Sequence, residues 1–89
     1  MKTIVAVVRN ERGLHARAAA RFVRLATRFT AQIRVGHDGK MMDGKSILSL
    51  LLLAAGCGTA LTITADGADQ TAAAAALAQL VESGFGEKP

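Results

Sequence analysis

The sequence is poor in aromatic residues, with no Trp, no Tyr and only three Phe among 89 residues. Its net charge of +4 would suit a nucleic-acid partner. Proteins that bind single-stranded nucleic acid, however, usually stack the bases on aromatic rings. The shortage of rings therefore argues against that class, and a basic surface for an acidic protein partner accounts for the charge equally well.

Other absences narrow the class of protein further. Cys57 is the single cysteine, so no internal disulfide can form, and one thiol fits a reducing compartment. No His, Cys, Asp or Glu cluster has metal-ligand spacing, and we expect no metal or other cofactor. The most apolar run, Leu48 to Cys57, is about half the roughly 18–20 residues of a membrane span. The first residues lack a secretory pattern, so we expect one cytoplasmic domain spanning 1–89.

Hydrophobic periodicity predicts seven elements in the order β-α-β-β-α-β-α. Strands are expected at Lys2–Val8, Ala31–His37, Lys40–Asp43 and Ala60–Asp66, and helices at Ala16–Arg28, from Ile47, and at Ala72–Ser83. Asp38-Gly39 is a strong hairpin-turn signal between the second and third strands. The order predicts an α+β fold, a two-layer open-faced β-sandwich in which three helices cover one face of a four-stranded antiparallel sheet.

Loops and helix ends carry more detailed expectations. We expect Gly56 to be the left-handed residue that ends the short helix, and Gly84 to stop the last one. Asp69 is expected to cap the last helix, whose apolar stripe would hold Ala73, Ala76, Leu77, Leu80 and Val81. We interpret His37 as a solvated turn residue and Cys57 as a small space-filler, and we expect a frayed tail over Phe85–Pro89.

His15 stands where the first loop gives way to the first helix. Because the helix begins at about Ala16, its first N–H groups lack intrahelical partners, and its dipole places partial positive charge there. Such an end binds phosphate readily, and Arg17 lies in the first turn. A neutral imidazole beside a phosphate site formed by Ala16 and Arg17 suggests a histidine that carries a phosphoryl group. The alternative is an ordinary solvated residue before a helix.

A stripe of arginines follows on the same helix. Arg17, Arg21, Arg24 and Arg28 recur at spacings of four, three and four residues, which places them roughly opposite the apolar face. Two interpretations remain open. The stripe either steers an acidic partner toward His15 or is an ordinary solvated helix face.

The short helix is apolar almost all round, and Ser46 stands at its N-cap position. We expect Leu50 and Leu53 to point inward. The remaining apolar side chains would then form an exposed patch of the kind that marks protein interaction sites, made of Ile47, Leu48 and Leu51. The alternative is a short helix that is buried on all sides.

Two motifs resemble signatures of the HPr family, the histidine-containing phosphocarriers of the bacterial phosphotransferase system. Gly13-Leu14-His15-Ala16-Arg17-Ala18 resembles the active-site signature, and Lys40 through Leu48 resembles the regulatory serine signature. The spacing of the two motifs and the order of the elements agree as well. The resemblance covers essentially the whole chain.

The resemblance implies roles for individual residues. His15 would carry the phosphoryl group on Nδ1, and Arg17 would hold the phosphoryl oxygens. Ser46 would be the site of a separate ATP-dependent serine kinase, with a matching phosphorylase, in bacteria that have one. A phosphoserine there would gain helix-dipole stabilisation and would repel an acidic partner. Partner docking would use Arg17, Arg21, Arg24, Ile47, Leu48 and Leu51.

The same resemblance implies a carrier rather than an enzyme. The phosphoryl group would come from enzyme I and pass to an enzyme IIA domain. The composition argues against nucleic acid and membrane as partners, and a monomer is the default expectation. Two alternatives are a nitrogen-branch phosphocarrier that acts mainly in signalling, and a basic nucleic-acid binder. Ala18 stands where many relatives have proline, and we expect a looser helix start with an intact site. The leucines after Ser49 also depart from many relatives.

Overall fold

The computed structural model describes residues 1–87. Its elements are β1 (Lys2–Val7), α1 (Ala16–Ala26), β2 (Gln32–His37), β3 (Lys40–Asp43), α2 (Ile47–Leu52), β4 (Ala60–Asp66) and α3 (Gln70–Glu82). The predicted order is confirmed, and the ends of elements move by at most two residues. None of the helices within 1–87 is long and apolar enough to cross a membrane.

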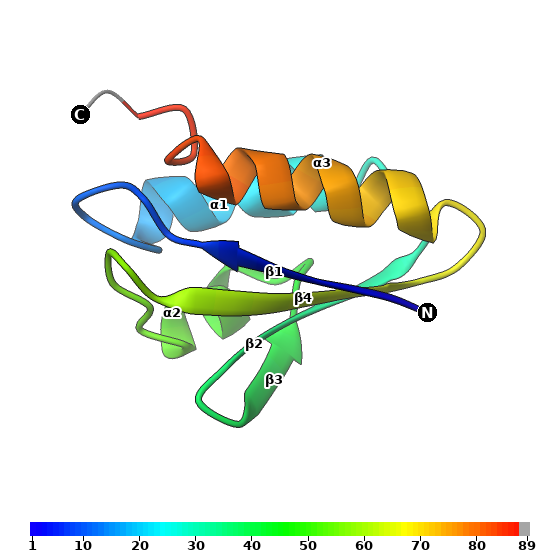
Figure 1. The fold of residues 1–89 in the computed structure, drawn as a ribbon, viewed down its shortest axis with the longest axis horizontal. Helices are drawn as coiled ribbons and strands as arrows, with labels where there is room; N and C mark the ends of the chain where they lie inside the picture. Colours follow the sequence, from blue (N-terminus) through cyan, green and yellow to red (C-terminus); the bar gives the residue numbers. More distant parts are fainter. Residues whose placement is uncertain (88–89) are drawn as a thin grey trace.

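The four strands form one antiparallel sheet in the order β1-β4-β2-β3. The last strand of the chain therefore lies inside the sheet, between the first and the second. Helices α1 and α3 contact each other and lie side by side along the sheet, as Figure 1 shows. The predicted two-layer fold, with an open antiparallel sheet and three helices, is confirmed.

The core lies between the sheet and the helices. From β4, Leu61, Ile63 and Ala65 are completely buried, as the alternation of that strand predicts. Phe22 of α1 and Phe85, beyond α3, are the largest side chains in the core. Complete burial of one such ring contributes roughly 1.5–3 kcal/mol to stability. The two rings join both helices to one core.

Residues with positive φ shape two connections, the turn between β2 and β3 and the loop before α1. Asp38 and Gly39 both have positive φ, 58° and 82°, so the predicted hairpin turn between β2 and β3 is confirmed. Gly13 has φ +70°, and a Cβ on it would lie 2.4 Å from the carbonyl oxygen of Ala55. The N–H of Leu14 donates to that same oxygen at 2.8 Å. The loop before α1 is therefore packed closely against the segment that follows α2.

Some expectations about loops are wrong. Ala54, with φ 51°, is the left-handed residue after α2, and Gly56 does not have positive φ. Cys57 is exposed rather than filling space in the core, and its Sγ lies 3.6 Å from the carbonyl oxygen of Arg9. The adjacent positive-φ glycine, Gly58, lets the chain turn there without a buried side chain. His37 is the last residue of β2 and pairs with the first residue of β3.

The last helix also differs from the prediction. Asp69 is its N-cap residue but makes no side-chain cap bond. Its carboxylate instead accepts hydrogen bonds from the N–H groups of Thr30 and Ala31, both at 2.8 Å, and so ties α3 to the chain entering β2. The buried stripe is Ala73, Ala74, Leu77, Ala78 and Val81, so Ala74 and Ala78 take the places expected for Ala76 and Leu80. Where most residues of a helix are alanine, the sequence does not determine which side of the helix faces the core.

The segment after α3 turns back toward the start of α1. Gly84, Phe85 and Gly86 have φ values of 74°, 57° and 75°, three left-handed residues in a row. Gly84 follows the end of the helix, as predicted. The expectation of a frayed tail is wrong for residues 85–87, because Phe85 is completely buried and its carbonyl accepts a bond from Arg21 Nη1 at 2.6 Å. Lys88 and Pro89 lie outside the described residues.

Candidate functional site

His15 is the N-cap residue of α1. Its extended backbone, with φ −83° and ψ −178°, lets its carbonyl accept the N–H of Ala19 at 2.8 Å while the imidazole folds over the helix end. The ring nitrogen Nδ1 accepts the N–H of Arg17 at 3.3 Å. The imidazole thus occupies the capping place that Ser or Asp usually takes. It stays 23% exposed, so one edge of the ring remains accessible.

The loop before His15 is held by Asn10, which is only 7% exposed. Its Nδ2 donates to the carbonyl of Gly13 at 2.7 Å and to Glu87 Oε1 at 2.8 Å. Leu14, 4% exposed, anchors the next position in the core. The position of the imidazole is therefore set from both sides, by this loop and by the helix.

Glu87 is the site residue that the sequence analysis missed. Its Oε2 lies 2.5 Å from Nε2 of His15, a contact across 72 positions of the chain. Because Nδ1 accepts from Arg17 N–H while Nε2 faces a carboxylate, the neutral ring carries its proton on Nε2. The lone pair of Nδ1 therefore points toward the positive end of α1. The only sequence signal was the Gly84–Gly86 pair, which allows the tail to fold back.

The carboxylate of Glu87 is ionised at neutral pH. A hydrogen bond from Asn10 lowers the pKa of Glu87, assisted by the bond and charge of His15 and the charge of Arg21, while burial opposes them. A negative charge next to Nε2 stabilises positive charge on the ring. Such charge develops when Nδ1 forms a bond to an electrophile.

The opposite side of the ring offers groups that bind anions. The N–H groups of Ala16, Arg17 and Ala18 precede the first intrahelical hydrogen bond, and α1 places partial positive charge there. A cavity of about 550 Å³ opens at Arg17, and its lining is both basic and acidic: Glu11, Arg12, Arg17, Arg21, Gly86 and Glu87. The guanidinium of Arg17 makes no hydrogen bond or ion pair with any of residues 1–87. It is therefore available to bind an anion.

Ser46 is the N-cap residue of α2. Its Oγ accepts the N–H of Ser49 at 3.2 Å, which confirms the predicted cap. Leu50 and Leu53 point inward, and the alternative of a fully buried helix is wrong. The exposed apolar patch on α2 consists of the predicted Ile47, Leu48 and Leu51 and also of Leu52, with exposed fractions from 37% to 70%. Helix α2 packs against α1, so this α2 patch adjoins the helix that carries His15.

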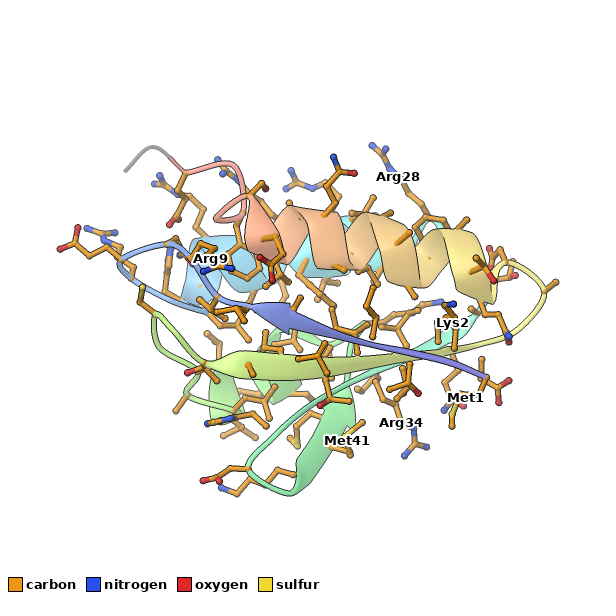
Figure 2. All side chains as sticks on the ribbon, in the orientation of Figure 1. Met1, Lys2, Arg9, Arg28, Arg34 and Met41 are labelled. Carbon is orange, nitrogen blue, oxygen red and sulfur yellow. The ribbon has the colours of Figure 1, made fainter. Side chains whose placement is uncertain are left out.

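The arginine stripe is exposed along the outer side of α1. Figure 2 shows the side chain of Arg28 directed away from the sheet, on the side of the helices. Arg21 is the exception, because it is half-buried and bonds the carbonyl of Phe85. Arg17 and Arg21 line one cavity with Glu87, the residue that contacts His15, while Arg24 continues the positive surface along α1 and Arg28 extends it into the turn after the helix.

Comparison with known proteins agrees with the geometry of the site. Residues 2–83 match the family profile described as the PTS HPr component phosphorylation site. The phosphocarrier protein HPr of Pseudomonas aeruginosa is 42% identical over 88 residues, covering 98% of each chain. That of Cupriavidus necator is 42% identical over 78 residues, covering 88% of each chain.

Solved structures give the same result. HPr from Thermoanaerobacter tengcongensis superposes with a TM-score of 0.94 at 40% identity, covering all of both chains. HPr from Bacillus anthracis gives 0.87 at 42% identity, covering 90% of this chain and 95% of that one. A dimer of the Thermoanaerobacter protein gives 0.77 at 41% identity, covering 98% and 100%. With a histidine at a helix N-terminus in the matched segment, the chain belongs to the HPr family of phosphocarrier proteins of the phosphotransferase system.

Proposed function

We propose that this chain, acting as one HPr-like domain over 1–89, accepts a phosphoryl group from phospho-enzyme I on Nδ1 of His15 and passes it to an enzyme IIA domain. The proposal rests on the different surroundings of the two ring nitrogens of His15. Nδ1 faces the N–H of Arg17 at the helix end, and Nε2 faces Glu87. The protein is then a cytoplasmic carrier, not an enzyme.

The proposed transfer step is balanced within the site. The hydrogen bond from the Arg17 N–H to Nδ1 opens, and the freed lone pair of Nδ1 forms a bond to phosphorus as the bond between phosphorus and the donor breaks. No proton has to move, because Nε2 keeps its own, and the carboxylate of Glu87 stabilises the positive charge that the ring acquires. Arg17 and the N–H groups of the first turn hold the phosphoryl oxygens. Transfer to the acceptor reverses these steps.

We further propose a docking surface that surrounds His15 on two helices. Its basic part is Arg17, Arg21 and Arg24 of α1, and its apolar part is Ile47, Leu48 and Leu51 of α2. Exposed apolar side chains on a helix that packs against the arginine-bearing α1 suit a partner that offers an apolar centre with an acidic rim.

Ser46 is proposed as a regulatory site for a serine kinase and phosphorylase. Its hydroxyl stands at the edge of the α2 patch and already caps the helix. A phosphate there would repel an acidic partner with little change of fold. Ser46→Asp should therefore be phosphorylated by enzyme I much more slowly than the parent, at equal or higher stability in urea. Normal phosphorylation of this variant would contradict the regulatory role.

The experiment that tests the central proposal is incubation with phosphoenolpyruvate and enzyme I, followed by mass spectrometry. We expect one phosphate adduct, labile to acid and stable to alkali, in the parent chain and in Ser46→Ala. His15→Ala should acquire none. An adduct on His15→Ala, or none on the parent chain, would overturn the assignment. The phosphorylated protein is then incubated with sugar-specific and nitrogen-type IIA domains. The domain that accepts the phosphoryl group shows which branch of the phosphotransferase system the protein serves.

We propose that the working form is a monomer. Dimers occur among relatives, since one solved neighbour is an HPr dimer. Light scattering across a range of protein concentrations decides the point, and a constant dimeric mass would refute the proposal.

A further inference from the structure

A groove runs between α1 and α3 on the side of the molecule away from the sheet. Its volume is about 340 Å³, with Arg21, Arg24 and Arg28 on one side. Leu25 and Leu80, partly buried and packed on the core, line its apolar part. The groove reaches Gly86 and Phe85 at the end near the His15 site. The α2 patch contributes no residue to it.

Arg24 and Arg28 of this groove have no acidic partner within residues 1–87, whereas the charge of Arg21 acts on Glu87. The side chains of Arg24 and Arg28 form no ion pair or hydrogen bond there, and Arg21 donates to a carbonyl rather than to a carboxylate. Helix α1 contains no acidic residue. On α3 the one charged residue is Glu82, and its carboxylate is already bound by the N–H of Val7 and by Arg9. Ordinary helix faces balance such charges with neighbouring Glu or Asp.

The spacing of the arginines defines what would fit. Arg21 and Arg24 lie three residues apart on α1, and Arg28 follows four residues later in the turn that continues the helix, where its N–H bonds the carbonyl of Leu25, so the three extend over roughly 10 Å. Carboxylates at i, i+3 and i+7 of a second helix repeat that spacing. Apolar side chains on the neighbouring positions of the same helix would meet Leu25 and Leu80. The alanine-rich α3 has short side chains, so a helix can approach closely.

We propose that the α1–α3 groove binds an acidic amphipathic helix of a protein partner. A membrane surface fits less well, because none of the exposed large apolar side chains within residues 1–87 lies on α1 or α3. Nucleic acid fits less well, because the groove offers leucines in place of rings that stack on bases. The groove shares Arg21 and Arg24 with the docking surface proposed above, but it uses no atom of His15, and Leu25, Arg28 and Leu80 belong to the groove alone.

The test uses the full chain and a labelled synthetic helix that carries Glu at i, i+3 and i+7 beside a leucine pair. We expect salt-sensitive binding, with amide shifts confined to α1, Leu80 and Gly86 in NMR spectra. Arg28→Glu should weaken binding at least fivefold. Arg34→Glu makes the same charge change on the opposite face of the sheet, as Figure 2 shows, and should bind within twofold of the parent.

Several outcomes would overturn the proposal. They are equal binding by a peptide of the same composition in scrambled order, unchanged affinity in Arg28→Glu, and shifts centred on the α2 patch. Tighter, Arg28-dependent binding of a DNA duplex or of phosphatidylglycerol vesicles would replace the proposed partner. His15→Ala should bind the peptide as the parent does, which separates this site from the phosphoryl site.

Discussion

At the scale of single residues, Glu87 acts on His15 through charge. The two meet at Nε2, on the side of the ring away from the anion-binding helix end. A carboxylate in that place supports a cationic ring, and a phosphoryl group on Nδ1 produces one. The same arrangement of carboxylate and imidazole orients histidines in other sites that use one ring nitrogen for chemistry.

The first prediction follows from this contact. Glu87→Gln keeps the acceptor for Asn10 but removes the charge facing Nε2. We expect the equilibrium for phosphorylation of His15 by enzyme I to fall about tenfold, since a charge-assisted bond exceeds a neutral one by about 1–1.5 kcal/mol. Quantitative mass spectrometry measures the fraction of the protein that is phosphorylated. The control is Glu11→Gln, because Glu11 is exposed and lines the same cavity of about 550 Å³ as Glu87. This variant should be phosphorylated to the same extent as the parent.

His15 and Arg17 could be predicted from the sequence, and Glu87 could not. The first two belong to a short motif at a helix start, where local rules of capping and dipole apply. The contact of Glu87 depends instead on three consecutive left-handed residues and on a phenylalanine in the core. No local sequence pattern predicts that the C-terminal segment contacts a residue 72 positions earlier in the chain.

At the scale of elements, α2 presents one face to the core and another to solvent within one turn. Leu50 is completely buried, and Leu48 is 70% exposed. We predict that Leu50→Ala lowers the free energy of unfolding by about 2–5 kcal/mol, whereas Leu48→Ala changes it by less than about 0.5 kcal/mol. Urea denaturation measures both. Leu48→Glu should also raise the KM of enzyme I for this chain, and an unchanged KM would remove Leu48 from the docking surface.

The end of α2 supplies a second prediction at this scale. Ala54 is exposed and has φ 51°, a conformation that costs an alanine about 1–2 kcal/mol. Glycine adopts it freely but loses about 0.5–1 kcal/mol of chain entropy on folding. Ala54→Gly should therefore stabilise the fold by about 0.5–1 kcal/mol in urea. A loss of stability would show that the conformation at Ala54 is not strained.

The elements themselves were largely predictable, whereas their ends and linkages were not. Alternation in β4 and the Asp38-Gly39 turn determine strands and hairpin locally. Asp69 shows the limit of such rules, because its carboxylate binds Thr30 and Ala31 rather than its own helix. A side chain that can cap a helix can equally bind a distant loop, and only the packing of α3 on the sheet decides between them.

At the scale of the whole molecule, three carboxylates link segments that are far apart in sequence. Bonds from Thr30 and Ala31 lower the pKa of Asp69, the bond from Val7 with Arg9 lowers that of Glu82, and the bond from Asn10 lowers that of Glu87. In all three cases burial acts in the opposite direction. The folded chain therefore binds fewer protons than the unfolded chain in mildly acidic solution.

This difference predicts how stability depends on pH. Since the folded pKa values are lowered, their contribution is complete above the unfolded values, about pH 4–4.5, and is lost as pH falls below them. Urea denaturation should show a constant free energy of unfolding above about pH 5.5 and a decline from about pH 5 downward. Asp69→Asn should be less stable at pH 7 and should show a shallower decline. An identical slope in that variant would contradict the role assigned to Asp69.

The return of the C-terminal segment also bears on biosynthesis. A ribosome makes His15 early, but the carboxylate that faces its ring arrives 72 positions later, and β1 must wait for β4 before it can pair. A nascent or prematurely terminated chain therefore displays the imidazole without its anionic neighbour. If His15 carries the phosphoryl group as proposed, completed polypeptides would be phosphorylated more readily than incomplete ones.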